Sequence, residues 1–115
     1  MNEYMRRLDK RIEGYQRRER ELIEDDRKDE ANFVKIRINI CEICKTLYQV
    51  SLKEINEMAI QKSYMKQIEK LFKSWESAYE KAKEHKDENK MMIEQLKIEE
   101  LESVREIFAR VVLEE

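Results

Sequence analysis

The stretch FVKIRINICEICKTLYQV, residues 33–50, carries the strongest information about the fold. On a helix that turns about 100° per residue, its apolar side chains cover roughly two-thirds of the circumference. Only a narrow strip, which includes Lys35 and Gln49, is clearly polar. A surface helix has a single apolar stripe, so this pattern predicts a central helix over residues 27–52 that other helices contact on several sides.

Three further helices are predicted on either side of this segment. Residues 3–24 and 58–84 each carry a heptad seam, in which key positions recur at alternating spacings of three and four. The seam of the first segment is Met5, Leu8, Ile12, Tyr15, Glu19 and Leu22, and that of the second is Tyr64, Ile68, Leu71, Trp75, Ala78 and Ala82. Residues 88–113 form the fourth predicted helix, with Ile93, Leu96, Leu101, Val104, Ile107, Phe108 and Val111 facing inward.

Short polar segments mark the ends of these helices. Asp26 is predicted to be the N-cap of the second helix and Asp87 that of the fourth, because a carboxylate accepts hydrogen bonds from the exposed amides of a first turn. Asn56 is the best candidate for the turn between the second and third helices, where no strong helix breaker occurs.

The composition agrees with an all-α fold. The chain has 115 residues, no proline, one glycine and 43% charged residues of both signs, so a sheet with tight turns is not expected. We expect one domain, residues 1–115, folded as an antiparallel, up-down-up-down four-helix bundle without an internal repeat. A three-helix arrangement is the alternative, if the second and third helices are continuous or the first projects as a dimerisation arm.

Charged residues at positions that should be apolar are the sharpest functional signal. Glu19 lies in the seam of the first helix, Arg37 within the second, and Lys97 and Glu100 within the fourth. Counted from the turns, these residues and Trp75 lie at similar depths of roughly 12–21 Å. Because an uncompensated buried charge is costly, we expect a Glu19–Arg37 pair.

Two interpretations of this charged layer stay open. It can be a salt-bridged polar layer that fixes the register of the helices. It can instead line a small pocket for an anion or a polar metabolite, with Glu19, Arg37, Lys97, Glu100 and Trp75 as ligand-binding residues.

Other reactive groups do not form a recognisable catalytic or metal site. Cys41 and Cys44 form a CxxC, but zinc needs four ligands and the chain has no second Cys/His pair. His85, the only histidine, is expected at the end of a helix, and it has no nucleophile near it in the sequence. We therefore expect no enzyme activity, no cofactor and no metal.

Charge and hydropathy limit the partners. The first twenty residues carry seven basic and four acidic side chains, but the whole chain has a net charge of -2, so nucleic-acid binding is not expected. No apolar run approaches the ~20 residues of a membrane span, and we expect a cytoplasmic protein with reduced cysteines. Met91-Met92 is interpreted as packing, with a partner surface as the alternative.

The predicted function is interaction with a protein partner or self-association as a homodimer. A coiled-coil-like contact of the N-terminal helix is the expected mode of dimerisation. Its main support is the absence of catalytic groups in the sequence. Ligand binding at the charged layer is the first alternative, and nucleic-acid association is the second.

Overall fold

The computed structural model describes residues 2–114, which form four helices and, within that range, no strand. The helices are α1 (Glu3–Glu24), α2 (Lys28–Ser51), α3 (Glu57–Glu84) and α4 (Glu88–Glu114). The prediction of an all-α fold is confirmed, and residues 52–56 separate α2 from α3. The three-helix alternative is therefore wrong.

The turn after α1 ends the helix in a way that the sequence did not reveal. Asp26 has a positive φ of 58°. The Arg27 amide donates to the Leu22 carbonyl at 2.8 Å and the Asp26 amide to the Ile23 carbonyl at 3.1 Å, which is a Schellman motif. Asp26 therefore terminates α1 and does not cap α2. Arg27 occupies the N-cap position without a side-chain cap, so that prediction is wrong.

The turn after α3 has the same geometry. Lys86 has a φ of 54°, and the Asp87 amide donates to the Ala82 carbonyl at 2.9 Å. Here the next residue does cap the following helix, because Asp87 Oδ1 accepts from the Lys90 amide at 3.1 Å. The cap predicted at Asp87 is thus confirmed, and Asn56 likewise caps α3 through the Ala59 amide at 2.9 Å.

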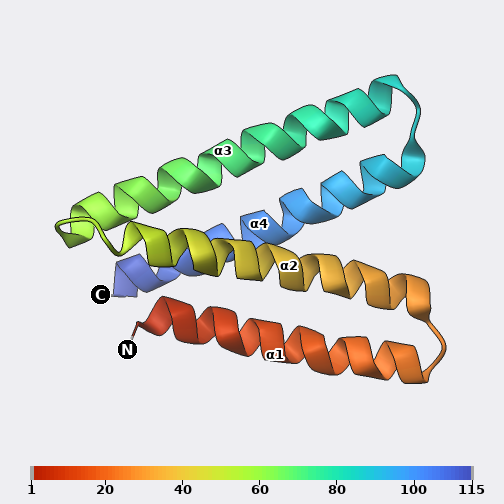
Figure 1. Cartoon of the computed structure of the whole chain (residues 1–115), viewed down its shortest axis with the longest axis horizontal. Coiled ribbons are helices and arrows are strands. Elements are labelled where there is room, and N and C mark those ends of the chain that lie inside the picture. The colour runs from red at the N-terminus through yellow and green to blue at the C-terminus, as the bar shows by residue number, and fades with distance from the viewer. Residues whose placement is uncertain (1, 115) are drawn as a thin grey trace.

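The helices form two hairpins, α1–α2 and α3–α4, arranged as a V (Figure 1). The hairpins meet at the end that holds both termini and the α2–α3 connection, and they diverge toward the two tight turns. Helix α2 packs against the other three helices, as predicted for a central helix, while no Cα of α1 lies within 8 Å of one in α3. Helix α1 rests against α2 and α4 and does not project as an arm.

The two hairpins are related by an internal repeat, although none was expected from the sequence. Tyr4 and Tyr64 are 60 residues apart, and most buried positions recur at that interval. The buried pairs are Tyr4/Tyr64, Leu8/Ile68, Ile12/Phe72, Leu22/Ala82, Ile40/Glu100, Cys41/Leu101, Cys44/Val104, Tyr48/Phe108 and Ser51/Val111. Helices α1 and α3 also end at equivalent residues, Glu24 and Glu84. The repeat makes the bundle approximately two-fold symmetric.

Aromatic side chains fill the closed end of the V. Tyr4 and Tyr64 are 1% and 0% exposed, and their hydroxyls are hydrogen-bonded to each other. Together with Tyr48 and Phe108, they make edge-to-face contacts with centroids 4.9–6.1 Å apart. Each of the four helices contributes one ring, so this cluster joins the two hairpins.

No helix in residues 2–114 combines the length and apolar character needed to cross a membrane.

Candidate functional site

A fully buried carboxylate lies at the centre of the molecule. Glu100 on α4 is 0% exposed. Its Oε1 accepts from the Tyr15 hydroxyl at 2.6 Å, Arg37 Nη1 at 2.8 Å and Arg11 Nη2 at 3.3 Å. Its Oε2 accepts from Arg11 Nε at 2.7 Å and Cys41 Sγ at 3.4 Å. These five residues are called the Glu100 cluster below.

Helical spacing brings these donors together. Arg11 and Tyr15 are four residues apart on α1, and Arg37 and Cys41 are four apart on α2, so each pair shares one face of its helix. Both faces turn toward α4. Two helices of one hairpin therefore surround a carboxylate from the other hairpin, and the cluster ties the two halves of the V together.

Opposing electrostatic effects act on the cluster. Burial raises the pKa of Glu100, but the hydrogen bonds from Arg11, Tyr15 and Arg37 outweigh burial, and the pKa lies below its ordinary value of 4.5. Burial, followed by the hydrogen bond to Glu100, raises the pKa of Tyr15 to about 12. At neutral pH the cluster therefore holds an ionised carboxylate and a neutral phenol that donates to it.

The structure divides the five predicted site residues among three places. Arg37 and Glu100 lie together, as described. Lys97 lies over the Trp75 ring, with Nζ 5.8 Å from the centroid. Glu19 pairs instead with Lys35 at 3.7 Å. The predicted Glu19–Arg37 pair is wrong, because Arg37 faces Glu100.

The Lys97 site contains a second buried carboxylate. Lys97 Nζ lies 3.2 Å from Glu94 Oε1. Glu94 is 6% exposed, and its other carboxylate oxygen has no hydrogen-bond partner in the described part of the chain. An unsatisfied buried oxygen destabilises the fold, since the carboxylate has lost water without full replacement.

Three members of the cluster were not predicted as site residues: Arg11, Tyr15 and Cys41. Arg11 is one of the seven basic side chains in the first twenty residues, and Tyr15 belongs to the predicted seam of the first helix. For Arg11 and Cys41 the 60-residue repeat gives the missing signal, because Arg11 corresponds to Leu71, Cys41 to Leu101 and Glu100 to Ile40. It gives no such signal for Tyr15, which corresponds to the aromatic Trp75. Leu71, Leu101 and Ile40 are all apolar. The comparison therefore marks the three positions at which a polar residue breaks the symmetry.

The remaining reactive side chains have local structural roles. Burial raises the pKa of both thiols, that of Cys44 to about 12, so neither is a thiolate near neutral pH. His85 lies at the end of α3, as predicted, with Nδ1 2.8 Å from the Lys81 carbonyl oxygen. Within residues 2–114, no three His, Cys, Asp or Glu side chains form a group able to hold a metal.

The charged groups of the cluster are already paired with one another. Arg11 is bound to Glu100, and Arg37 has Glu100 and, at 4.0 Å, Glu99. Lys97 is likewise paired with Glu94. This arrangement favours the structural interpretation of the charged layer and gives the anion-binding interpretation no specific support.

Comparisons with known proteins give no further lead. No family model, no curated protein and no solved structure matches this chain.

Proposed function

We propose that this chain is a non-enzymatic, cytoplasmic, antiparallel four-helix bundle that acts by binding a second copy of itself. The two free cysteines fit a reducing compartment, and their raised pKa values fit a protein without a thiol nucleophile. The proposal of self-association rests on a groove between α2 and α4.

The groove lies where the two hairpins diverge. It comprises adjoining depressions of about 320 and 520 Å³ that share Phe33 and Met92. Apolar side chains from both helices line it, including Ile36 and Leu96, and Met92 is 50% exposed. When a partner covers partly exposed apolar surface of this kind, the free energy of the complex is lowered.

The symmetry of the groove favours a second copy as the partner. Its lining includes pairs 60 residues apart, Asn32 with Met92 and Phe33 with Ile93. A second copy can place the same groove against this one about a two-fold axis between the copies, which is the isologous contact of most homodimers.

Helix α1 is not the surface that we propose for dimerisation. The apolar seam of α1 suggested a coiled-coil-like contact between chains. Leu8, Ile12 and Leu22 of this seam are 0–5% exposed within one chain, so they are not free to pair with a partner.

Light scattering coupled to size-exclusion chromatography tests the proposal. The wild-type protein is expected to elute as a dimer. Met92→Glu is expected to elute as a monomer with an unchanged helical circular dichroism spectrum, because the charge enters the groove at a half-exposed position and leaves the core intact. Met58→Glu is the matched control: Met58 is 67% exposed and lies outside the groove, so this variant should stay dimeric. A wild-type monomer, or a dimer that both variants retain, would refute the proposal.

A further inference from the structure

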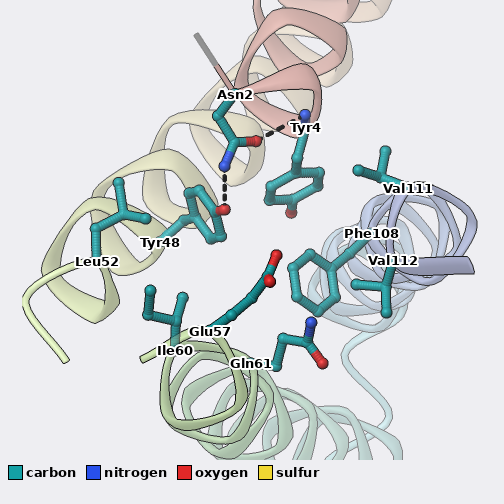
Figure 2. Close-up of a pocket in the computed structure, with 10 residues that line it drawn as sticks. All are labelled: Asn2, Tyr4, Tyr48, Leu52, Glu57, Ile60, Gln61, Phe108, Val111 and Val112. Carbon is teal, nitrogen blue, oxygen red and sulfur yellow. Dashed lines mark hydrogen bonds between the residues drawn. The ribbon is translucent and has the colours of Figure 1, made fainter. Parts of the chain in front are cut away.

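A second cavity lies at the opposite end of the molecule from the groove. It has a volume of about 210 Å³ and is lined by residues of all four helices (Figure 2). The rings of Tyr4, Tyr48 and Phe108 form one side, in edge-to-face contact with centroids 5.0–6.1 Å apart. Aliphatic side chains, among them Ile60 and Val112, complete the apolar walls.

The aromatic wall is held in place by hydrogen bonds. The Asn2 side chain donates to the Tyr48 hydroxyl and accepts from the Tyr4 amide at 2.8 Å. Tyr4 is also hydrogen-bonded to Tyr64 on the far side of the ring cluster. A wall fixed in this way loses little conformational entropy when a ligand binds, which favours recognition of a small molecule.

One carboxylate, that of the exposed residue Glu57, points toward this apolar space. Figure 2 shows the side chain of Glu57 directed between Tyr48, Tyr4 and Phe108. Its backbone position is fixed at the start of α3, which Asn56 caps. Within residues 2–114, no ion pair or hydrogen bond occupies the Glu57 carboxylate. Among residues 2–114, the lining of the cavity therefore has a negative charge beside aromatic walls and no Lys or Arg side chain to match it.

We propose that this cavity binds a small organic cation of the alkylammonium type. The electron-rich faces of aromatic rings attract cations, most effectively those with a methylated, weakly hydrated surface. The carboxylate adds a Coulombic attraction that a neutral or anionic ligand would not gain. The volume is below the roughly 300–1,000 Å³ of pockets for drug-sized ligands, so the ligand is one quaternary or short-chain ammonium group.

The cation pocket is independent of the dimer groove, which uses other residues at the open end of the V. The groove variant Met92→Glu should therefore bind the cation as the wild type does. This separation allows either proposal to fail without affecting the other.

A pair of isosteric probes tests the pocket. Choline and 3,3-dimethylbutan-1-ol have the same shape, but only choline is charged. Titration of each into the protein is followed by NMR of the aromatic and methyl groups. We expect choline to shift the resonances of Tyr48, Phe108 and Ile60 and to bind about fivefold more tightly than the alcohol, as a partly exposed ion pair supplies.

Variants at two neighbouring carboxylates identify the group that selects the charge. Glu57→Gln should remove the preference for choline, while Glu54→Gln, an exposed carboxylate outside the cavity, should leave it unchanged. Equal affinity for the two probes would overturn the proposal and define a purely apolar pocket. Absence of binding by choline, or an unchanged preference in Glu57→Gln, would overturn it as well.

Discussion

Replacing Arg11 and Glu100 by the residues that occupy the equivalent positions of the repeat tests the account of the Glu100 cluster. Sixty residues away, Leu71 stands in place of Arg11 and Ile40 in place of Glu100. The variants are therefore Arg11→Leu, Glu100→Ile and the double substitution. Each replacement residue is one that a similar environment in the same molecule already accommodates.

The expected magnitudes follow from the groups that each variant leaves unpaired. Arg11→Leu removes two hydrogen bonds from a carboxylate that stays buried, which costs about 2 kcal/mol. Glu100→Ile removes the shared acceptor and costs about 3 kcal/mol. In the double variant Arg37 keeps Glu99 at 4.0 Å, while Tyr15 still lacks its acceptor, for a loss of about 2 kcal/mol. The coupling energy is then about 3 kcal/mol, at the upper end for contacting residues.

Thermal and urea denaturation followed by circular dichroism measure these differences. One kcal/mol corresponds to roughly 4 °C in melting temperature for a chain of this size. The double variant should melt no lower than Glu100→Ile alone. The control is the cycle of Glu19→Gln with Arg37→Met, which should show no coupling, because Glu19 faces Lys35. Additive losses in the first cycle, or coupling in the control, would show that this account of the cluster is wrong.

Two further predictions concern acid stability and the first turn. The folded-state pKa of Glu100 is lowered, so the ionised carboxylate stabilises the fold at pH values above its ordinary pKa of 4.5. This stabilisation is lost as the pH falls through the folded-state pKa. The melting temperature of the wild type should thus drop in acid more steeply than that of Glu100→Gln, and parallel curves would contradict this. Asp26→Gly should raise the stability to urea by roughly 0.5–1 kcal/mol, since Asp26 has a φ of 58°. Asp25→Gly, at a φ of -87°, should lower it, and the same sign for both would contradict the role of the positive φ.

The helices could be predicted from the sequence because apolar periodicity reports directly on which face is buried. The first helix was placed at residues 3–24, as found, and the central role of α2 followed from its wide apolar surface. The cap at Asp26 could not be predicted in the same way. Asp26 could act either as the N-cap of α2 or as the positive-φ residue that ends α1. Only the hydrogen bonds to the Leu22 and Ile23 carbonyls show which role it has.

The site could be predicted only in part, because depth along a helix is easier to infer than direction around it. Counting residues from the turns placed Arg37 and Glu100 in neighbouring layers, and they do meet. The same count placed Glu19 with them, yet Glu19 faces the exposed side of α2, where Lys35 lies. Arg11 was missed because its charge suggested a surface position, although it is one residue from the buried Ile12.

The broken symmetry explains why a buried ionic cluster occurs in a fold that is otherwise closed by apolar contacts. The two hairpins have nearly equivalent buried faces. The α1–α2 hairpin could therefore pack against the α3–α4 hairpin of the same chain, or each hairpin could pack against the same hairpin of another chain. Pairing two second halves would place Leu71 and Leu101 where Arg11 and Cys41 donate to Glu100, with Lys97 and Trp75 at the positions of Arg37 and Tyr15. Pairing two first halves would leave Arg11 facing Ile40. In the first pairing the carboxylate loses both hydrogen bonds from Arg11, and in the second Arg11 loses its partner, so each mismatch is destabilising. Only the pairing of unlike halves gives the carboxylate all of its observed donors, so the Glu100 cluster favours the fold within one chain through the penalty that it imposes on the alternatives.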